Sequence, residues 1–188
     1  IFGVYGYLSK TTNAGANWTK IPCPQTMHFM CADALDENTL LAGTGWGRIY
    51  KSTNGGVDWV EKHWENGEQI ADVCFHGQDT CYAVSSHGKI YTSFDGGETW
   101  SVKKYGDRQY THIRFLNENV GWISGSQGFM LRTTDGGITW NDVFIGTHQS
   151  QNNVFFFDEN NGFIVGNGGM LLHTSNGGYT SVPEKIIK

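Results

Sequence analysis

Residues 133–140 read TTDGGITW, and altered copies of this stretch recur along the whole chain. The copies are TTNAGANW at 11–18, STNGGVDW at 52–59, SFDGGETW at 93–100 and TSNGGYTS at 174–181. The Asn or Asp at the third place falls at Asn13, Asn54, Asp95, Asp135 and Asn176, so successive copies lie 41, 41, 40 and 41 residues apart. A fixed period of this length indicates a protein built by stacking one small structural unit.

Each copy has the composition of a tight turn between two strands. Its Ser or Thr hydroxyl and its Asn or Asp side chain can accept hydrogen bonds from backbone N–H groups. Its glycines supply backbone conformations with positive φ. A tryptophan that can pack beneath the turn closes four of the copies, at Trp18, Trp59, Trp100 and Trp140, while Ser181 ends the fifth. We therefore predict a structural hairpin without chemistry of its own.

The residues around each turn predict four short strands per unit. In the fourth unit, strand-like runs YTHIRFLN, VGWISGSQG and FMLRTT precede the turn, and ITWNDVF follows it. Four strands in about forty residues match the blade of a β-propeller. We predict an all-β propeller over 1–183, with a C-terminal tail or the start of a linker at 184–188. The expected repeats cover approximately 1–24, 25–67, 68–108, 109–149 and 150–183.

The first repeat is incomplete. Aligning residues 6–10 with residues 128–132 places Ile1 within the second strand, so the first strand is absent. Either five blades close by some other strand, or further blades precede this sequence. We favour the second alternative, a part of a larger propeller, because an unpaired blade edge promotes aggregation.

The motifs that end at Trp18, Trp59, Trp100 and Trp140 resemble the Asp-box, or bacterial neuraminidase, repeat. Units such as GFMLRTTDGGITW resemble those of the photosystem II assembly and stability factor family and of related secreted bacterial propellers. The resemblance covers nearly the whole chain and implies the propeller fold. It does not settle function, because Asp-box propellers include sialidases, xyloglucanases, sortilin-type receptors and non-catalytic assembly factors.

A sialidase would be expected to carry three substrate-binding arginines and an Arg-Ile-Pro type segment near its start. This sequence has no such segment, and its four arginines are scattered, at Arg48, Arg108, Arg114 and Arg132. A xyloglucanase would need two carboxylates facing each other across a cleft. Four carboxylates near first strands or the following loops are candidates, although we expect them to be turn residues: Asp33, Asp72, Glu118 and Asp158. We expect a non-catalytic scaffold, with a fragment of an Asp-box glycoside hydrolase as the alternative.

The propeller topology places one set of loops on the face opposite the Asp-box turns. Trp46 and His87 fall in loops between second and third strands. Trp64, Tyr105, Arg108 and Tyr110 fall in or beside the loops that join blades. Exposed aromatic residues close to an arginine are typical of binding hot spots. We predict that these six residues bind a protein partner or larger assembly, with a glycan-binding surface protein as the other reading.

The charge and residue content narrow the remaining options. A net charge of −5 and a pI near 5.7 argue against a nucleic-acid partner. We expect no direct membrane insertion, no metal and no cofactor, because neither a long apolar run nor a ligand motif occurs.

The cysteines bear on location. Cys74 and Cys81 flank a predicted hairpin turn, and Cys23 and Cys31 are also close in sequence. We predict two disulfides and an extracytoplasmic location, whether secreted, cell-surface, periplasmic or lumenal. Four buried free thiols are the alternative.

Overall fold

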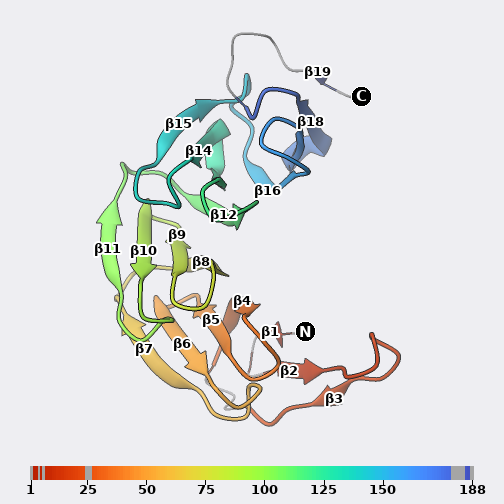
Figure 1. Ribbon diagram of the computed structural model, residues 1–188, viewed down its shortest axis with the longest axis vertical. Coiled ribbons are helices and arrows are strands. Elements are labelled where there is room, and N and C mark those ends of the chain that lie inside the picture. The colour runs from red at the N-terminus through yellow and green to blue at the C-terminus, as the bar shows by residue number, and fades with distance from the viewer. Residues whose placement is uncertain (1, 4, 6, 24–26, 179–184, 187–188) are drawn as a thin grey trace. The chain divides into compact units, whose positions relative to one another are not determined.

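The computed structural model describes residues 2–3, 5, 7–23, 27–178 and 185–186, which form five antiparallel sheets (Figure 1). We call these sheets blades 1 to 5 in chain order. The chain divides into two compact units, of residues 1–85 with 90–103 and of residues 86–89 with 104–188. Each unit is described by itself.

Blades 1 to 3 make up the first unit, apart from the ends of β10 and β11. Blade 1 contains β1 (Phe2–Gly3), β2 (Tyr7–Lys10) and β3 (Thr19–Lys20). Blade 2 contains β4 (Phe29–Ala34), β5 (Leu40–Thr44), β6 (Arg48–Ser52) and β7 (Val60–Trp64). Blade 3 contains β8 (Ile70–Phe75), β9 (Cys81–Ser85), β10 (Lys89–Ser93) and β11 (Ser101–Lys104).

Blades 4 and 5 lie in the second unit. Blade 4 contains β12 (Tyr110–Phe115), β13 (Gly121–Gly125), β14 (Phe129–Thr133) and β15 (Asn141–Phe144). Blade 5 contains β16 (Gln151–Phe156), β17 (Gly162–Gly166), β18 (Met170–Thr174) and β19 (Lys185–Ile186). Two single turns of 3-10 helix, η1 (Ser126–Gly128) and η2 (Asn167–Gly169), lie between strands. No helix in the described ranges is long and apolar enough to cross a membrane.

The four-stranded blade predicted from the sequence is confirmed in blades 2 to 5. Blade 1 has three strands among the described residues, and β1 pairs with β2 so that Phe2 lies opposite Leu8. β1 corresponds to the second strand of the other blades, so the described residues of blade 1 include no first strand, as the repeat alignment predicts. In blade 5, β19 pairs with β18 and supplies the fourth strand from the segment expected to be a tail or linker.

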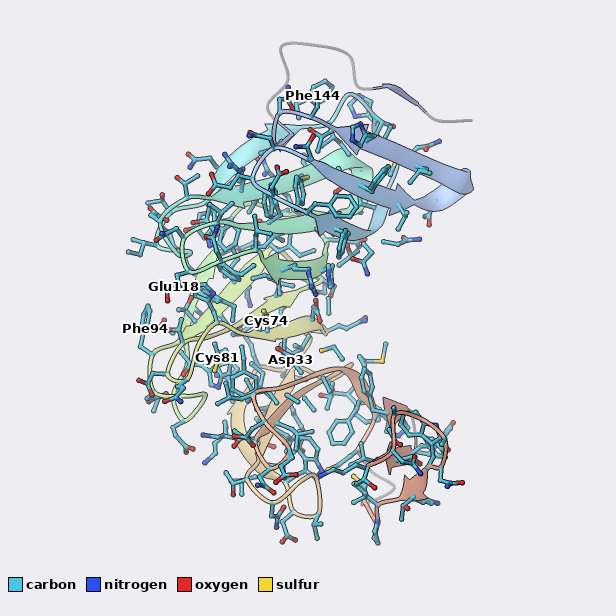
Figure 2. All side chains as sticks on the ribbon, turned by 45° about the vertical axis from the view of Figure 1, so that its right-hand side comes forward. Asp33, Cys74, Cys81, Phe94, Glu118 and Phe144 are labelled. Atoms are coloured by element: carbon cyan, nitrogen blue, oxygen red, sulfur yellow. The ribbon has the colours of Figure 1, made fainter. Side chains whose placement is uncertain are left out.

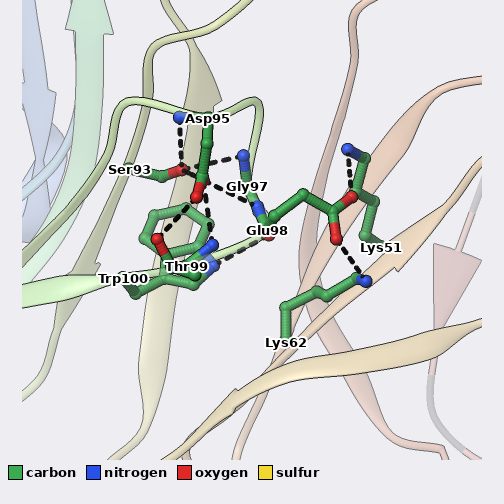
Figure 3. A network of polar contacts seen from close by, with 8 residues as sticks. All are labelled: Lys51, Lys62, Ser93, Asp95, Gly97, Glu98, Thr99 and Trp100. Carbon is green, nitrogen blue, oxygen red and sulfur yellow. Dashed lines mark hydrogen bonds and ion pairs between the residues drawn. The ribbon is translucent and has the colours of Figure 1, made fainter.

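The Asp-box turns form as predicted, and the turn of blade 3 shows the pattern (Figure 3). The Gly97 N–H donates to Ser93 Oγ at 2.8 Å, and the Thr99 N–H donates to Asp95 Oδ1 at 2.9 Å. The Trp100 indole N–H donates to the Gly97 carbonyl at 3.2 Å. The bond from the second glycine to the Ser or Thr hydroxyl recurs in the other four copies, from Gly15, Gly56, Gly137 and Gly178. The last three residues of the fifth copy, including Ser181, lie outside the described residues.

A basic residue just before an Asp-box links its blade to the next blade. Lys10 of blade 1 donates to the Glu37 carbonyl of blade 2 at 3.0 Å. Lys51 of blade 2 forms an ion pair with Glu98 of blade 3 at 2.7 Å (Figure 3). Glu98 also forms an ion pair with Lys62 of blade 2. In the second unit, Arg132 takes the same place and donates to the Glu159 carbonyl at 3.4 Å. The repeat therefore joins blades as well as forming them.

Apolar side chains fill the space between neighbouring blades of each unit. In the first unit, Leu41 and Ile49 of blade 2 pack with Ile70 and Val73 of blade 3. In the second unit, the Trp122 ring of blade 4 lies flat on Phe156 of blade 5, with ring centroids 3.6 Å apart. These contacts account for the burial of the alternating apolar residues in the strands.

The cysteine prediction was wrong. All four cysteines are among the described residues, and all four are free. In the β8–β9 hairpin, Cys74 lies opposite Tyr82 while Cys81 lies opposite Phe75. Because neighbouring residues of a strand point to opposite faces, Cys74 and Cys81 lie on different faces of blade 3 (Figure 2). Burial raises the pKa of the Cys81 thiol to about 12 and also raises the pKa of Cys31.

Candidate functional site

A row of three aromatic rings lies on the surface of the first unit. Trp46 stands in the turn between β5 and β6 and is 55% exposed. Its ring packs against His28 at a centroid distance of 4.5 Å and an interplanar angle of 74°. His28 packs in turn against Tyr5 at 4.8 Å, and Tyr5 is 72% exposed. The arrangement leaves a large aromatic surface open to a ligand.

A second tryptophan lies at the end of β7 in the same blade. Trp64 is 53% exposed and lies opposite Arg48 of β6. The Arg48 guanidinium lies over the Trp64 ring, 4.9 Å from its centroid, and forms an ion pair with Glu61. Glu61 offsets the charge of Arg48. This part of the surface therefore presents a guanidinium group stacked on an indole ring, with little net charge.

The two tryptophans are carried by chain segments that are fixed to each other. The Glu65 N–H donates to the Gly47 carbonyl at 3.0 Å. Gly47 has φ +75°, and a β-carbon there would lie 1.9 Å from the Glu65 carbonyl oxygen. The backbone of the turn after Trp46 therefore contacts the backbone of the segment after Trp64 directly, with no side chain between them. We call Tyr5, His28, Trp46, Arg48 and Trp64 the aromatic end of blade 2.

A polar network lies next to these segments. The Tyr91 hydroxyl donates to Glu65 Oε2 at 3.0 Å, and the His63 ring lies 5.1 Å from the Tyr91 ring. Glu68 is buried in the same loop. Burial raises the pKa of Tyr91 far above its usual range, and the nearby carboxylates of Glu65 and Glu68 raise it further. Tyr91 is therefore a neutral hydrogen-bond donor that anchors the loop.

The other four predicted binding residues lie in the second unit. His87 is exposed, and its Nδ1 is 3.1 Å from Ser86 Oγ. The Arg108 guanidinium lies 4.5 Å from the centroid of the Phe129 ring and pairs with Asp142. Tyr105 is half-buried.

Tyr110 was predicted to lie on the binding surface, but the structure buries it. It is the first residue of β12, is only 2% exposed, and donates from its hydroxyl to the Tyr105 carbonyl at 3.1 Å. Burial raises its pKa to about 12. Tyr110 therefore supports the loop before β12 and does not offer a surface to a partner.

The sequence predicts Trp46 and Trp64 as binding residues but does not point to their neighbours Tyr5, His28 and Arg48. Arg48 could have been found, because strand pairing in the repeat places the first residue of β6 opposite the last residue of β7. No signal in the sequence links Tyr5 and His28 to Trp46, because the contact joins blade 1 to a loop of blade 2.

Three of the four carboxylates considered for catalysis have local structural roles. Asp33 accepts hydrogen bonds from the N–H groups of Ala34 and Phe75, at 2.9 and 2.8 Å. Asp72 accepts from Val73, and Asp158 accepts from the N–H groups after it in its turn. In the described part of the chain, no group of three or more His, Cys, Asp or Glu residues is placed to hold a metal ion.

Comparison with solved structures shows the fold. A GH74 enzyme from Niastella koreensis is 19% identical, with 96% of this chain and 34% of that chain covered and a TM-score of 0.75. The structure titled "Structure of U3-55K" is 11% identical, with 90% and 54% covered and a TM-score of 0.73. The structure titled "YCF48 bound to D1 peptide" is 19% identical, with 90% and 71% covered and a TM-score of 0.51. At these identities the likeness concerns the fold alone, which is that of β-propeller blades. This chain spans about a third of the length of the Niastella enzyme.

The sequence identifies the family. The profile described as photosynthesis system II assembly factor YCF48 matches residues 62–146 and 106–184, which together span more than half of the chain. The chain belongs to this family, and the resemblance stated from its Asp-box units is confirmed. No curated protein sequence matches it.

Proposed function

We propose that the chain is a non-catalytic propeller scaffold that binds a protein partner through the aromatic end of blade 2. The observation that carries this proposal is the exposure of two tryptophans outside the repeat pattern, on segments fixed to each other by the Gly47–Glu65 contact. Tryptophan, tyrosine and arginine are the residues most enriched in binding hot spots. Fixed segments also reduce the entropy lost when a partner binds.

The family supports a protein as the partner. Its description names an assembly factor, and one solved relative carries a bound D1 peptide. A partner protein would cover the His28 and Trp46 rings while leaving the Arg48–Glu61 ion pair at the edge of the contact. Partly apolar centres with polar rims are usual for such interfaces.

We also propose an extracytoplasmic location for the chain. This location rests on the resemblance of the Asp-box units to those of secreted bacterial propellers. The four free cysteines provide no support for an oxidising compartment.

The scaffold is proposed to be non-catalytic because three of the four candidate carboxylates, Asp33, Asp72 and Asp158, accept hydrogen bonds from backbone N–H groups. A glycoside hydrolase needs two carboxyl groups free to act on opposite sides of the bond that breaks. The chain covers 34% of the Niastella enzyme, and that likeness in fold carries no activity with it.

Photocrosslinking in the host cell tests the proposal. A benzoylphenylalanine residue would replace Trp46, Trp64 or, as a control, Phe94, which is 68% exposed in an Asp-box turn of the same unit. We expect the same protein adduct from positions 46 and 64 and none from position 94. Equal labelling at all three positions, or an adduct that a glycosidase removes, would contradict protein binding at this site.

A further inference from the structure

Three residues of the aromatic end of blade 2 form an unbroken row of rings, in the order Tyr5, His28 and Trp46. The outer rings of the row, Tyr5 and Trp46, are largely exposed, while His28 between them is half-buried. Laid end to end, the centroid distances of 4.8 and 4.5 Å separate Tyr5 from Trp46 by at most about 9 Å. The row therefore offers two exposed aromatic contacts at a short, defined spacing.

Loops carry all three rings of this row. Tyr5 lies between β1 and β2, and Trp46 lies between β5 and β6, so both stand at the tips of hairpin loops. In the repeat they hold the same place, directly before Gly6 and Gly47. His28 comes directly before β4. Because none of the three belongs to a strand, a partner segment on the row has no strand edge to extend, and its side chains must make the contacts.

The rings of the row are steeply tilted relative to one another. The planes of Tyr5 and His28 meet at 66°, and those of His28 and Trp46 meet at 74°. The row is thus not one flat platform on which a single planar ligand could stack. A segment that follows it must present a new face to each ring in turn, as a ridged, regularly twisting chain does.

The chemistry of the row favours a backbone with few N–H groups. Tyr5 and Trp46 carry no charge at neutral pH, and the nearby Arg48 is already paired with Glu61. A peptide laid over aromatic rings loses water from its backbone donors, and burial of a donor without a partner costs free energy. Proline has no backbone N–H and avoids this cost. Its carbonyl group can accept from an indole N–H, which is a donor only.

We propose that the row binds a proline-rich segment of the partner protein in the polyproline II conformation, an inference that rests on the proposed function. This helix has three residues per turn and rises about 3.1 Å per residue, so one face recurs about every 9 Å. Two prolines three positions apart can therefore contact Tyr5 and Trp46 together. Such a segment is extended before it binds, which lowers the entropy lost on binding.

Titration of the 188-residue protein with synthetic peptides, followed by NMR chemical shifts, tests this inference. With decaproline we expect saturable shifts of the Trp46 indole N–H and of the Tyr5 and His28 amides. A ten-residue peptide of alternating glycine and serine should cause no such shifts. In an alanine-based peptide, prolines at every third position should bind more tightly than prolines at every fourth position, because only the first spacing returns to the same face of the helix.

Two variants remove one end of the row each. Trp46→Ala should raise the Kd for decaproline at least about tenfold, as expected for loss of a hot-spot ring. Tyr5→Asn should have a similar effect, and asparagine tolerates the positive φ of this residue, +58°. Phe94→Ala is the matched control, because it removes an exposed ring from an Asp-box turn of the same unit, and it should leave the Kd unchanged. All three variants should keep the melting temperature within a few degrees.

Several results would overturn the inference: decaproline shifts that do not saturate, equal affinity in Trp46→Ala and Phe94→Ala, or equal affinity for the two proline spacings. Shifts of the row with cellohexaose but not with decaproline would also overturn it and would indicate a glycan. If decaproline fails to bind while positions 46 and 64 crosslink to one protein, this inference is wrong and the proposed function stands. Decaproline binding without any crosslinked protein would support the inference for the row and contradict the proposed function.

Discussion

At the scale of single residues, the Asp-box depends on a few side chains that stand in for backbone acceptors. Asp95 and Asp135 each accept from a threonine hydroxyl and from that threonine's own N–H. These hydrogen bonds lower the pKa of both carboxyl groups, those to Thr99 and Thr139 having the largest effect. Asn13, Asn54 and Asn176 occupy the same place without a charge.

The low pKa of Asp95 and Asp135 predicts how stability changes in acid. A carboxyl group whose folded pKa lies below its unfolded value of about 4 stabilises the fold above that pH and loses this effect as pH falls. The double variant Asp95→Asn/Asp135→Asn should therefore lose less stability than the natural protein between pH 5 and pH 2. Urea unfolding across this range measures the difference. Parallel pH profiles would show that the two carboxylates are not stabilised in the fold.

Gly47 provides a residue-scale test of the site geometry. Gly47→Ala places a β-carbon against the Glu65 carbonyl and should cost about 3 kcal/mol or more in the free energy of unfolding. Gly67→Ala is the matched control, because Gly67 also has positive φ, at +80°, but nothing lies within 4 Å. It should cost about 1 kcal/mol. Equal losses in the two variants, measured by urea unfolding, would mean that the Gly47–Glu65 contact is not close.

At the scale of the strand and blade, the sequence predicts the repeating features of the blades but does not specify the pairing register of neighbouring strands. The Asp-box spacing predicts the strand order, the incomplete first blade and the turns, because each depends on local residues at fixed intervals. The faces of Cys74 and Cys81 depend on a one-residue difference in pairing, which two strand-like runs joined by a loop do not specify. The same limit applies to Tyr110, which the sequence places at the start of a strand beside a loop without specifying which way its side chain faces.

The structure predicts four free thiols. Protein unfolded in denaturant with iodoacetamide and no reductant should gain four alkyl groups by intact mass. In the folded protein, Cys31 and Cys81 should react slowest, because burial raises their pKa and limits access. Fewer than four alkyl groups in the unfolded protein would restore the disulfide prediction.

The packing between blades 4 and 5 predicts contrasting effects of two tryptophan substitutions. Trp122→Ala removes a ring that is 1% exposed and should cost about 3–5 kcal/mol in the free energy of unfolding. Trp64→Ala removes a ring that is 53% exposed and should change it by less than about 1 kcal/mol. Similar losses in both variants, measured by denaturant unfolding, would contradict the assignment of Trp64 to a surface.

At the scale of the whole molecule, the chain is a set of blades, and the Asp-box turns maintain the fold of each blade. The repeat accounts for Trp18, Trp59, Trp100 and Trp140, and Trp122 is buried between blades 4 and 5. The two remaining tryptophans require another explanation. Trp46 and Trp64 lie on segments fixed to each other and remain largely exposed. The description of the family names an assembly factor, and the proposed binding surface at these two residues can be tested directly.

The affinity of the crosslinked partner for the double variant Trp46→Ala/Trp64→Ala tests this account most directly, with Phe94→Ala as the control. Loss of hot-spot tryptophans should cost about 2 kcal/mol or more, which corresponds to a Kd raised at least about thirtyfold. The control should bind like the natural protein, and both variants should keep its melting temperature within a few degrees. An unchanged Kd in the folded double variant would contradict the proposal that the aromatic end of blade 2 is the binding surface.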